Sequence, residues 1–232
     1  MSQLKSIKVN RPEYVEVIPS NKREVKISPF RVADEKNLMV AANSENSADL
    51  ANAIENVVEN CITGVEVDEL APFDIEYLFL KLRSVSVGES TDLGLKCSEC
   101  KETTEVNVDL KEIKIKESPD HNPIIKINKE LGFEMKYMTL KESLSFDGTD
   151  EEIFAMVASS VKTVFWGDET ITVDSTNRKD LEEIISELTS GDFEKITNFF
   201  DTMPKLSETI DFACSKCGHQ NEITVEGMQS FF

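Results

Sequence analysis

The sequence predicts an α+β protein, because two different apolar patterns occur along its 232 residues. In several segments apolar residues recur every three or four positions, as in a helix with one buried face, and in others they alternate with polar residues, as in a half-buried strand. Two Cys-x-x-Cys motifs lie far apart, and alternating apolar positions flank both of them. We therefore expect an N-terminal β-hairpin with helices, two thiol-bearing hairpins, and a mainly helical insertion between these hairpins.

Residues 1–90 are predicted to form an N-terminal α+β region. Residues 14–18 and 24–27 alternate apolar and polar side chains on either side of a turn that contains proline and asparagine, so they are expected to pair as a hairpin. Helical spacing then covers residues 32–42 and 47–61. This region therefore combines a small sheet with helices.

The centre of the N-terminal region is predicted to be a helix that begins near Pro72. From Pro72 to Arg83, apolar side chains occupy nearly every side of the helix, which is typical of burial on several faces. Cys61, the fifth cysteine, falls on the apolar stripe of the preceding helix. We expect it to be a small buried side chain rather than a metal ligand or a nucleophile.

Four of the five cysteines lie in two motifs of identical spacing, Cys97-Ser98-Glu99-Cys100 and Cys214-Ser215-Lys216-Cys217. When these motifs are aligned, apolar residues occupy matching positions on both flanks. The matched pairs are Leu93 with Ile210, Leu95 with Phe212, Val106 with Ile223 and Val108 with Val225. Two equivalent hairpins with a thiol pair at each tip can enclose one metal ion, so residues 91–110 and 206–226 are predicted to form a split zinc ribbon.

Cys97, Cys100, Cys214 and Cys217 are the predicted ligands of one structural zinc ion per chain. Four soft thiolates suit the tetrahedral preference of zinc and leave no coordination position open for catalysis. The two pairs are much further apart in sequence than the usual roughly 15 to 20 residues, so the matched flanks carry more of the argument than the spacing does. Two disulfides, a dithiol redox centre and a pair of empty turns remain alternatives.

Residues 111–205 are predicted to form an inserted α+β unit that is mainly helical. A hairpin is expected around residues 129–132, and His121 falls in a turn-rich loop before it, where we expect a solvated side chain. Helical spacing is found in residues 153–164, 179–188 and 193–200. The insertion is therefore expected to be a folded unit and not a loop.

The chain is strongly acidic, with 44 acidic against 25 basic residues and a net charge of −19. Contacts to phosphates require a basic surface, so this charge argues against nucleic-acid binding. No apolar run approaches the roughly 20 residues of a membrane helix, and the polar segment from Met1 to Lys8 does not resemble a secretory signal. We therefore expect synthesis in the cytosol, where thiols stay reduced and can bind metal.

Motifs for catalysis are absent from the sequence. It has no phosphate-binding glycine loop, no Gly-x-Ser-x-Gly turn and no His-Glu-x-x-His pair. Only two histidines occur, and His219, close to Cys217, is expected to be a polar neighbour of the thiolates because four cysteines already complete the metal shell. We therefore expect that the protein is not an enzyme.

The order of several further segments is distinctive. These are Ser28-Pro29-Phe30, then Pro72-Phe73-Asp74-Ile75-Glu76-Tyr77-Leu78-Phe79-Leu80-Lys81-Leu82-Arg83, then Ser86-Val87-Gly88-Glu89, the two thiol pairs, and Phe231-Phe232. In this order the chain resembles the baseplate hub assembly proteins of T-even-type contractile-tailed bacteriophages. The resemblance covers nearly the whole chain and is most specific from Pro72 to Cys100.

The resemblance implies a structural subunit or an assembly factor (chaperone) for the baseplate hub of a contractile phage tail. Such a protein acts through contacts with other hub or tape-measure proteins, in the host cytoplasm during assembly, and lies in the tail baseplate of the virion if it stays there. The alternative function is a zinc-ribbon regulator that binds nucleic acid or polymerase.

Residues 227–232 are predicted to form an aromatic C-terminal tail. Leaving Phe231 and Phe232 in water forgoes about 2 to 3 kcal/mol for each side chain that could be buried. We therefore expect these two side chains either to fold back on the protein or to bind a partner.

Overall fold

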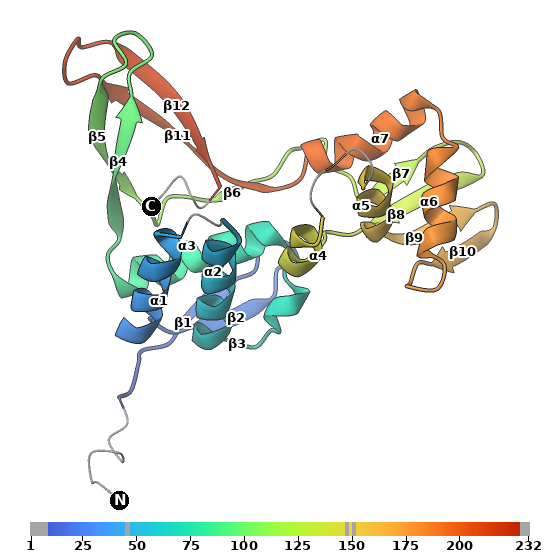
Figure 1. Ribbon diagram of the computed structural model, residues 1–232, viewed down its shortest axis with the longest axis horizontal. Helices are drawn as coiled ribbons and strands as arrows, with labels where there is room; N and C mark the ends of the chain where they lie inside the picture. The colour runs from blue at the N-terminus through green and yellow to red at the C-terminus, as the bar shows by residue number, and fades with distance from the viewer. Residues whose placement is uncertain (1–8, 45–46, 147–148, 150–151, 228–232) are drawn as a thin grey trace, which may run out of the picture. The chain divides into compact units, whose positions relative to one another are not determined.

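The structure is a computed structural model that describes residues 9–44, 47–146, 149 and 152–227 (Figure 1). The chain divides into two units. The first unit contains the residues up to 69, residues 73–115 and the residues from 206 onward, and the second contains residues 70–72 and 116–205. Both Cys-x-x-Cys motifs therefore belong to the first unit. Within the described part of the chain, no helix has the length and apolar character needed to span a membrane.

The N-terminal part of the first unit combines a small sheet with helices, as predicted. Its elements are β1 (Tyr14–Val17), β2 (Glu24–Ile27), α1 (Val32–Ala42), α2 (Ser47–Cys61), β3 (Ile62–Thr63), the 3-10 helix η2 (Val67–Glu69) and α3 (Pro72–Ser86). The three strands are antiparallel and lie in the order β1-β2-β3. The predicted hairpin and the three predicted helices are confirmed.

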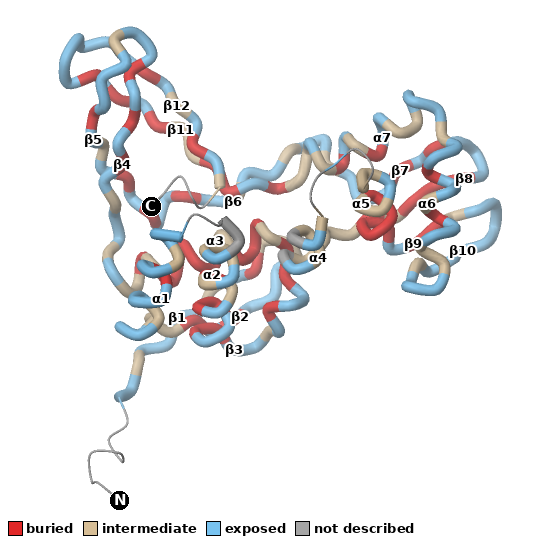
Figure 2. Tube along the Cα trace, in the orientation of Figure 1, coloured by how far each residue is buried: buried red, intermediate tan, exposed pale blue. Residues whose placement is uncertain are grey.

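Helix α3 buries most of its side chains, and Figure 2 shows it as a largely buried stretch. Its apolar core residues, each at most 4% exposed, are Phe73, Ile75, Leu78, Phe79, Leu80 and Leu82. Two buried polar side chains of α3 tie other segments to it. Asp74 Oδ1 accepts a hydrogen bond from Ser20 N at 2.9 Å, and Lys81 Nζ donates one to Lys111 O at 2.9 Å. The prediction that this helix forms the centre of the N-terminal core is confirmed.

Two longer hairpins complete the first unit. Their strands are β4 (Ser90–Lys96) with β5 (Thr103–Asp109), and β11 (Lys205–Ala213) with β12 (Gln220–Glu226), while β6 (Ile115–Lys116) lies beside β11. Both hairpins have the same register, since Leu93 lies opposite Val106 and Ile210 lies opposite Ile223. Positions that match in the sequence flanks of the cysteines are therefore also matching positions in the two ladders.

The second unit consists of an antiparallel sheet with helices packed against it. Its strands are β7 (Ile124–Lys126), β8 (Leu131–Met135), β9 (Val161–Trp166) and β10 (Glu169–Thr172), in the order β10-β9-β8-β7. Its helices are α4 (Leu140–Leu144), α5 (Ile153–Ser159), α6 (Arg178–Ser186) and α7 (Ser190–Asp201). Phe133 from the sheet, Val157 from α5 and Ile196 from α7 are fully buried in its core. The unit thus has a hydrophobic core of its own.

One predicted helix of this unit is wrong in its second half. Helical spacing predicts a helix over residues 153–164, but α5 ends at Ser159 and β9 begins at Val161. Val161 and Val164 fit a helical stripe because both are buried in the same core as α5. The segment is nevertheless rich in β-branched and aromatic residues, and it pairs with β8 on one side and β10 on the other.

Candidate metal centre

The tips of the two thiol hairpins lie close together (Figure 1). Four cysteine side chains come together there. The Sγ atoms of Cys97, Cys100, Cys214 and Cys217 all lie within 4.8 Å of one another. Between the hairpins, Cys97 Sγ lies 3.7 Å from Cys217 Sγ, and Cys100 Sγ lies 3.6 Å from Cys214 Sγ. The predicted ligands are therefore assembled in one cluster.

The spacing of these sulfur atoms fits a tetrahedral metal ion. Four thiolates at about 2.3 Å from a zinc ion stand about 3.8 Å apart at the corners of a regular tetrahedron. A disulfide, by contrast, requires two sulfur atoms about 2 Å apart, and all five cysteines in the structure are free. The donor set and its geometry are thus compatible with a metal site of four thiolates.

Each Cys-x-x-Cys motif folds into the same tight turn. In the first motif, Cys97 N donates to Glu102 O at 2.8 Å and Lys101 N donates to Cys97 O at 3.1 Å. In the second motif the equivalent bonds are Cys214 N to His219 O at 2.9 Å and Gly218 N to Cys214 O at 2.9 Å. The residue after the second cysteine has a left-handed backbone in both turns, with φ of 60° at Lys101 and 71° at Gly218. The two turns are therefore equivalent bond for bond.

Backbone N–H groups of the turns point at the first sulfur of each pair. Hydrogen bonds from the backbone of Cys100 and Glu99 lower the pKa of the Cys97 thiol. The backbone of Cys217 and Lys216 does the same for Cys214 and lowers its pKa to about 6. Both motifs thus stabilise a thiolate, which is the form that binds metal.

The fourth thiol of the cluster behaves differently because other sulfur atoms surround it. The backbone N–H of His219 lowers the pKa of Cys217, but Cys100, desolvation, Cys214 and Cys97 raise it, and together they bring it to about 12. Hydrogen bonds with the neighbouring cysteine side chains favour the protonated form of Cys217 and so oppose a further thiolate. A bound divalent cation removes this opposition, since it compensates the charge of the thiolates that coordinate it.

Two buried polar side chains join the hairpins beside the cysteines. Asn221 Oδ1 accepts hydrogen bonds from Ser98 N and Ser98 Oγ, both at 2.9 Å. At the equivalent position of the other hairpin, Thr104 Oγ1 accepts a hydrogen bond from Ser215 N at 3.2 Å. The Asn221 amide also donates to Cys97 Sγ at 3.6 Å. Each hairpin therefore supports the turn of the other.

Sequence reasoning missed Thr104 and Asn221, although a signal for them exists. Each residue follows the first cysteine of its pair at the same distance. Each is polar and buried, with 9% of Thr104 and 5% of Asn221 exposed. A polar residue at matching positions of two apolar-patterned hairpins is the pattern that could have indicated them.

Two other residues considered as possible ligands lie outside the cluster. Cys61 is buried in the core of the first unit, 3% exposed, and its Sγ accepts a weak hydrogen bond from Arg11 Nη1 at 3.6 Å. Burial also raises the pKa of its thiol. His219 is exposed, and its backbone carbonyl, rather than its ring, supports the second turn by accepting from Cys214 N.

The prediction of a solvated His121 is wrong. Its ring is half-buried in the second unit, where Nε2 lies 2.8 Å from Tyr137 Oη and Nδ1 lies 3.0 Å from Thr202 Oγ1. The ring also packs against Tyr137 and Phe199. The turn-rich sequence around it gave no sign of these contacts, because Thr202 and Phe199 come from the distant helix α7 and its C-terminal end.

The candidate partner-binding residues Phe231 and Phe232 lie outside the described residues.

Comparison with known proteins identifies the family. A sequence model of the T4 bacteriophage base plate protein family matches residues 11–232, which include the N-terminal sheet and both thiol hairpins. The chain belongs to this family. The baseplate hub assembly protein gp26 of Enterobacteria phage T4 is 21% identical to this base plate protein over 208 residues, which cover 89% of this chain and 93% of gp26. No solved structure matches this base plate protein. The resemblance predicted from the sequence is confirmed.

Proposed function

We propose that this base plate protein is an assembly factor (chaperone) for the baseplate hub of a contractile phage tail. The observation that carries the proposal is the family match over residues 11–232, joined by the similarity to a protein named for hub assembly along nearly its whole length. The factor acts through protein–protein contacts with other hub or tape-measure proteins in the host cytoplasm. A structural subunit that remains in the tail baseplate is the other form of the same role.

We further propose that the four clustered cysteines bind one structural zinc ion and make the two hairpins a split zinc ribbon. When bound, zinc would cross-link the hairpins and would offer no open coordination position to a substrate. The chain's own residues support this role: backbone N–H groups stabilise the thiolates, and Asn221 and Thr104 hold each turn against the opposite hairpin. The zinc ion would therefore join the second thiol hairpin to the first within the first unit.

We propose neither a catalytic nor a nucleic-acid-binding function for this protein. Four thiolates would fill the metal shell, and the ring of His121 is committed to Tyr137 and Thr202. The net charge of −19 opposes contacts with phosphates. A zinc-ribbon regulator of nucleic acid or polymerase therefore has less support than an assembly factor.

The partner proposal can be tested by capture of the tagged full-length protein from infected bacteria. We expect hub or tape-measure proteins to co-purify during assembly. Purified virions then separate the two forms of the role, because an assembly factor is absent from them and a structural subunit is present. Recovery of nucleic acid or host transcription proteins alone would overturn the proposal.

The metal proposal is tested separately by elemental analysis of the full-length protein purified under reducing conditions. We expect one zinc per chain, and we expect Cys214→Ser to lose most of it. Cys61→Ala is the matched control, since Cys61 lies outside the cluster and its replacement should leave the zinc content unchanged. A wild-type protein without bound metal, or equal zinc content in both variants, contradicts the proposed ligand set.

A further inference from the structure

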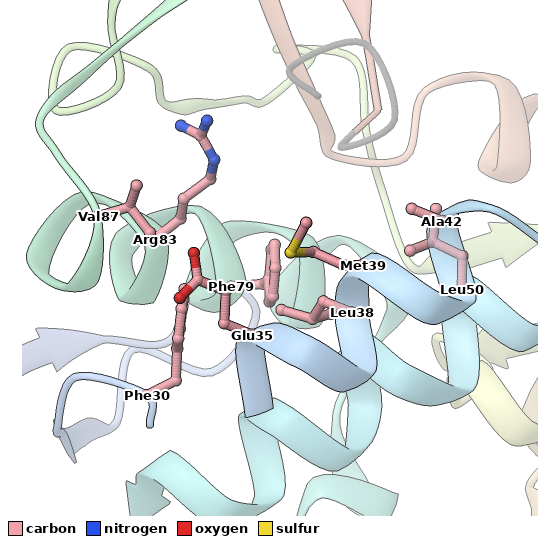
Figure 3. A pocket seen from close by; sticks show the side chains of 9 residues that line it. All are labelled: Phe30, Glu35, Leu38, Met39, Ala42, Leu50, Phe79, Arg83 and Val87. Carbon is pink, nitrogen blue, oxygen red and sulfur yellow. The ribbon is translucent and has the colours of Figure 1, made fainter. Parts of the chain in front are cut away.

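An apolar pocket lies in the first unit where α1, α2 and α3 meet (Figure 3). It has a volume of about 180 Å³. Its apolar lining comes mainly from Phe30, Leu38, Met39, Leu50, Phe79 and Val87. Figure 3 shows Leu38, Met39 and Phe79 clustered in this lining. The chemistry of the pocket therefore suits an aliphatic or aromatic side chain.

Two of the apolar side chains that line this pocket are exposed in the part of the chain that the structure describes. Of the residues that line the pocket, Met39 is 63% exposed and Val87 is 58% exposed. Only Leu38 of α1 is buried. Exposed apolar side chains at the edge of an apolar pocket indicate a site that another segment or protein covers.

The described chain ends beside α3, the helix that contributes Phe79 and Arg83 to the pocket. Gly227 N donates to Leu206 O at 2.8 Å, and a φ of 70° at Gly227 turns the chain away from β12. A Cβ atom placed on Gly227 would lie 3.5 Å from Glu76 Oε1, so the backbone at this point passes next to α3. The chain therefore reaches α3 near the N-terminal end of that helix.

Glu76 lies on the same side of α3 as the residues of this helix that line the pocket. Phe79 and Arg83 follow Glu76 at steps of three and seven residues, and residues at these steps share one face of a helix. With a rise of 1.5 Å per residue, Phe79 lies about 5 Å and Arg83 about 10 Å further along the axis. Five extended residues span up to about 17 Å. The five residues after Gly227 are long enough to reach the pocket.

We propose that Met228-Gln229-Ser230-Phe231-Phe232 runs along this face of α3 and places a phenylalanine side chain in the pocket of the same chain. The segment is apolar at three of its five positions, and burial of an aromatic ring removes a large apolar area from water. Attachment at Gly227 gives the segment an effective concentration near the millimolar range, which a second copy or a partner does not reach at ordinary protein concentrations. From the sequence, Phe231 and Phe232 are expected either to fold back on the protein or to bind a partner. The apolar pocket, and its distance from Gly227 along α3, favour folding back on the same chain.

Methyl NMR of the full-length zinc-bound protein tests this inference. With ¹³C-labelled methionine and leucine methyl groups, we expect nuclear Overhauser contacts from a phenylalanine ring to the methyl groups of Met39 and Leu38. The double substitution Phe231→Ala with Phe232→Ala should shift both methyl resonances, and the shift should not depend on protein concentration. The matched control, Gln229→Ala with Ser230→Ala, keeps both rings and should leave these resonances in place.

A variant on the pocket side supports the test independently. Met39→Glu places a charge at the rim of the pocket, and the exposure of Met39 means that the fold should tolerate it. We expect this variant to lose the ring contacts to Leu38 and to increase hydrogen exchange in the segment after Gly227. Unchanged methyl resonances in the double alanine variant overturn the proposal. Contacts that grow with protein concentration would show that the segment binds a second copy of the chain. Contacts that form only when hub proteins are added would show that it binds a partner. Either result also overturns the proposal, while the hub-assembly role would stand.

Discussion

Asn221 and Ser98 join the two thiol hairpins, because the Asn221 amide oxygen accepts hydrogen bonds from both the backbone N–H and the hydroxyl group of Ser98. The relationship is reciprocal. Thr104, which is equivalent to Asn221 in the first hairpin, accepts from the backbone of Ser215, which is equivalent to Ser98 in the second. The hairpins therefore hold each other's cysteine turns without any strand pairing between them. This arrangement predicts that stability at the metal centre depends on residues that bind no metal.

Replacement of Asn221 by leucine is expected to destabilise the hairpin pair. The side chain is buried, and its loss leaves the Ser98 backbone N–H without its acceptor, which costs about 1 to 3 kcal/mol. Zinc should also pass more quickly to a chelator, since the amide donates to Cys97 Sγ. Urea denaturation followed by circular dichroism measures the first effect, and a colorimetric chelator measures the second.

Thr224→Val is the matched control for this prediction. Thr224 lies on β12 like Asn221, but it is exposed, and its hydroxyl lies 3.1 Å from Thr209 Oγ1 of the neighbouring strand, away from the cysteine turns. Exposed substitutions of this kind usually change stability by less than about 0.5 kcal/mol. Equal stability and equal zinc release in the two variants contradict a supporting role for Asn221.

Removal of the metal is expected to loosen the two thiol hairpins and to leave the second unit folded. The second unit has its own hydrophobic core, whereas the hairpins are joined at their tips by the cysteines and a few hydrogen bonds. Hydrogen exchange with and without a chelator should show faster exchange in residues 90–109 and 205–226. Trp166, the single tryptophan, lies on β9 of the second unit, so its fluorescence reports that unit.

The Trp166 emission spectrum should therefore stay unchanged when the metal is removed. Re-addition of zinc should restore slow exchange in both hairpins, which excludes irreversible damage by the chelator. A change in Trp166 emission at the same chelator concentration as the change in the hairpins contradicts this independence. So does unchanged exchange in the hairpins once the metal is gone.

The second unit is expected to lose stability when the pH falls below about 6.5. Desolvation lowers the pKa of His121 from its ordinary value of 6.5, and the nearby Glu117 opposes this only partly. Well above pH 6.5 the ring is neutral in both the folded and the unfolded chain. Below it the unfolded chain takes up the proton first, so the free energy of unfolding falls until the pH also passes the lowered pKa of the folded state.

Urea denaturation followed by Trp166 fluorescence between pH 5 and 7.5 measures this effect. The variant His121→Gln removes the titrating ring, so its stability should vary less with pH in this window, although it should be lower at pH 7.5 because the contacts with Tyr137 and Thr202 change. His219→Gln is the control, since His219 belongs to the first unit and should not affect the Trp166 signal. An identical pH profile for wild type and His121→Gln contradicts the prediction.

The local part of this structure could be predicted from the sequence. The helix from Pro72 is recognisable because its apolar residues occupy all sides, and the register of the two thiol hairpins follows from matching flanks of the cysteines. The clustering of the four cysteines could also be predicted, because two thiol-tipped hairpins have a shared chemical reason to meet.

Features that depend on distant partners could not be predicted in this way. The apolar residues Val161 and Val164 satisfy a helical stripe as well as a strand, and pairing with β8 and β10 decides between the two. The contacts of His121 with Tyr137 and Thr202 likewise join segments that the sequence places far apart. Hydrophobic periodicity is a property of a single segment, so it gives no information on which distant segments pair or contact each other.

Lys101 and Gly218 occupy equivalent left-handed positions after the cysteine pairs. A left-handed backbone costs a residue with a side chain about 1 to 2 kcal/mol, whereas glycine adopts it freely but loses more entropy on folding. We therefore expect Lys101→Gly to raise the free energy of unfolding by about 0.5 to 1 kcal/mol and Gly218→Ala to lower it by about 1 kcal/mol or more. Urea denaturation of the zinc-bound protein measures both changes.

The variant Lys101→Ala distinguishes the effect of the left-handed backbone on stability from the effect of the lysine side chain. It removes the hydrogen bond from Lys101 Nζ to Ser98 O at 2.6 Å but keeps a Cβ atom in the left-handed conformation. If the backbone is the cause, Lys101→Ala gains no stability and Lys101→Gly does. If both variants change stability equally, the lysine side chain is responsible, and the equivalence of the two turns then does not extend to their backbone strain.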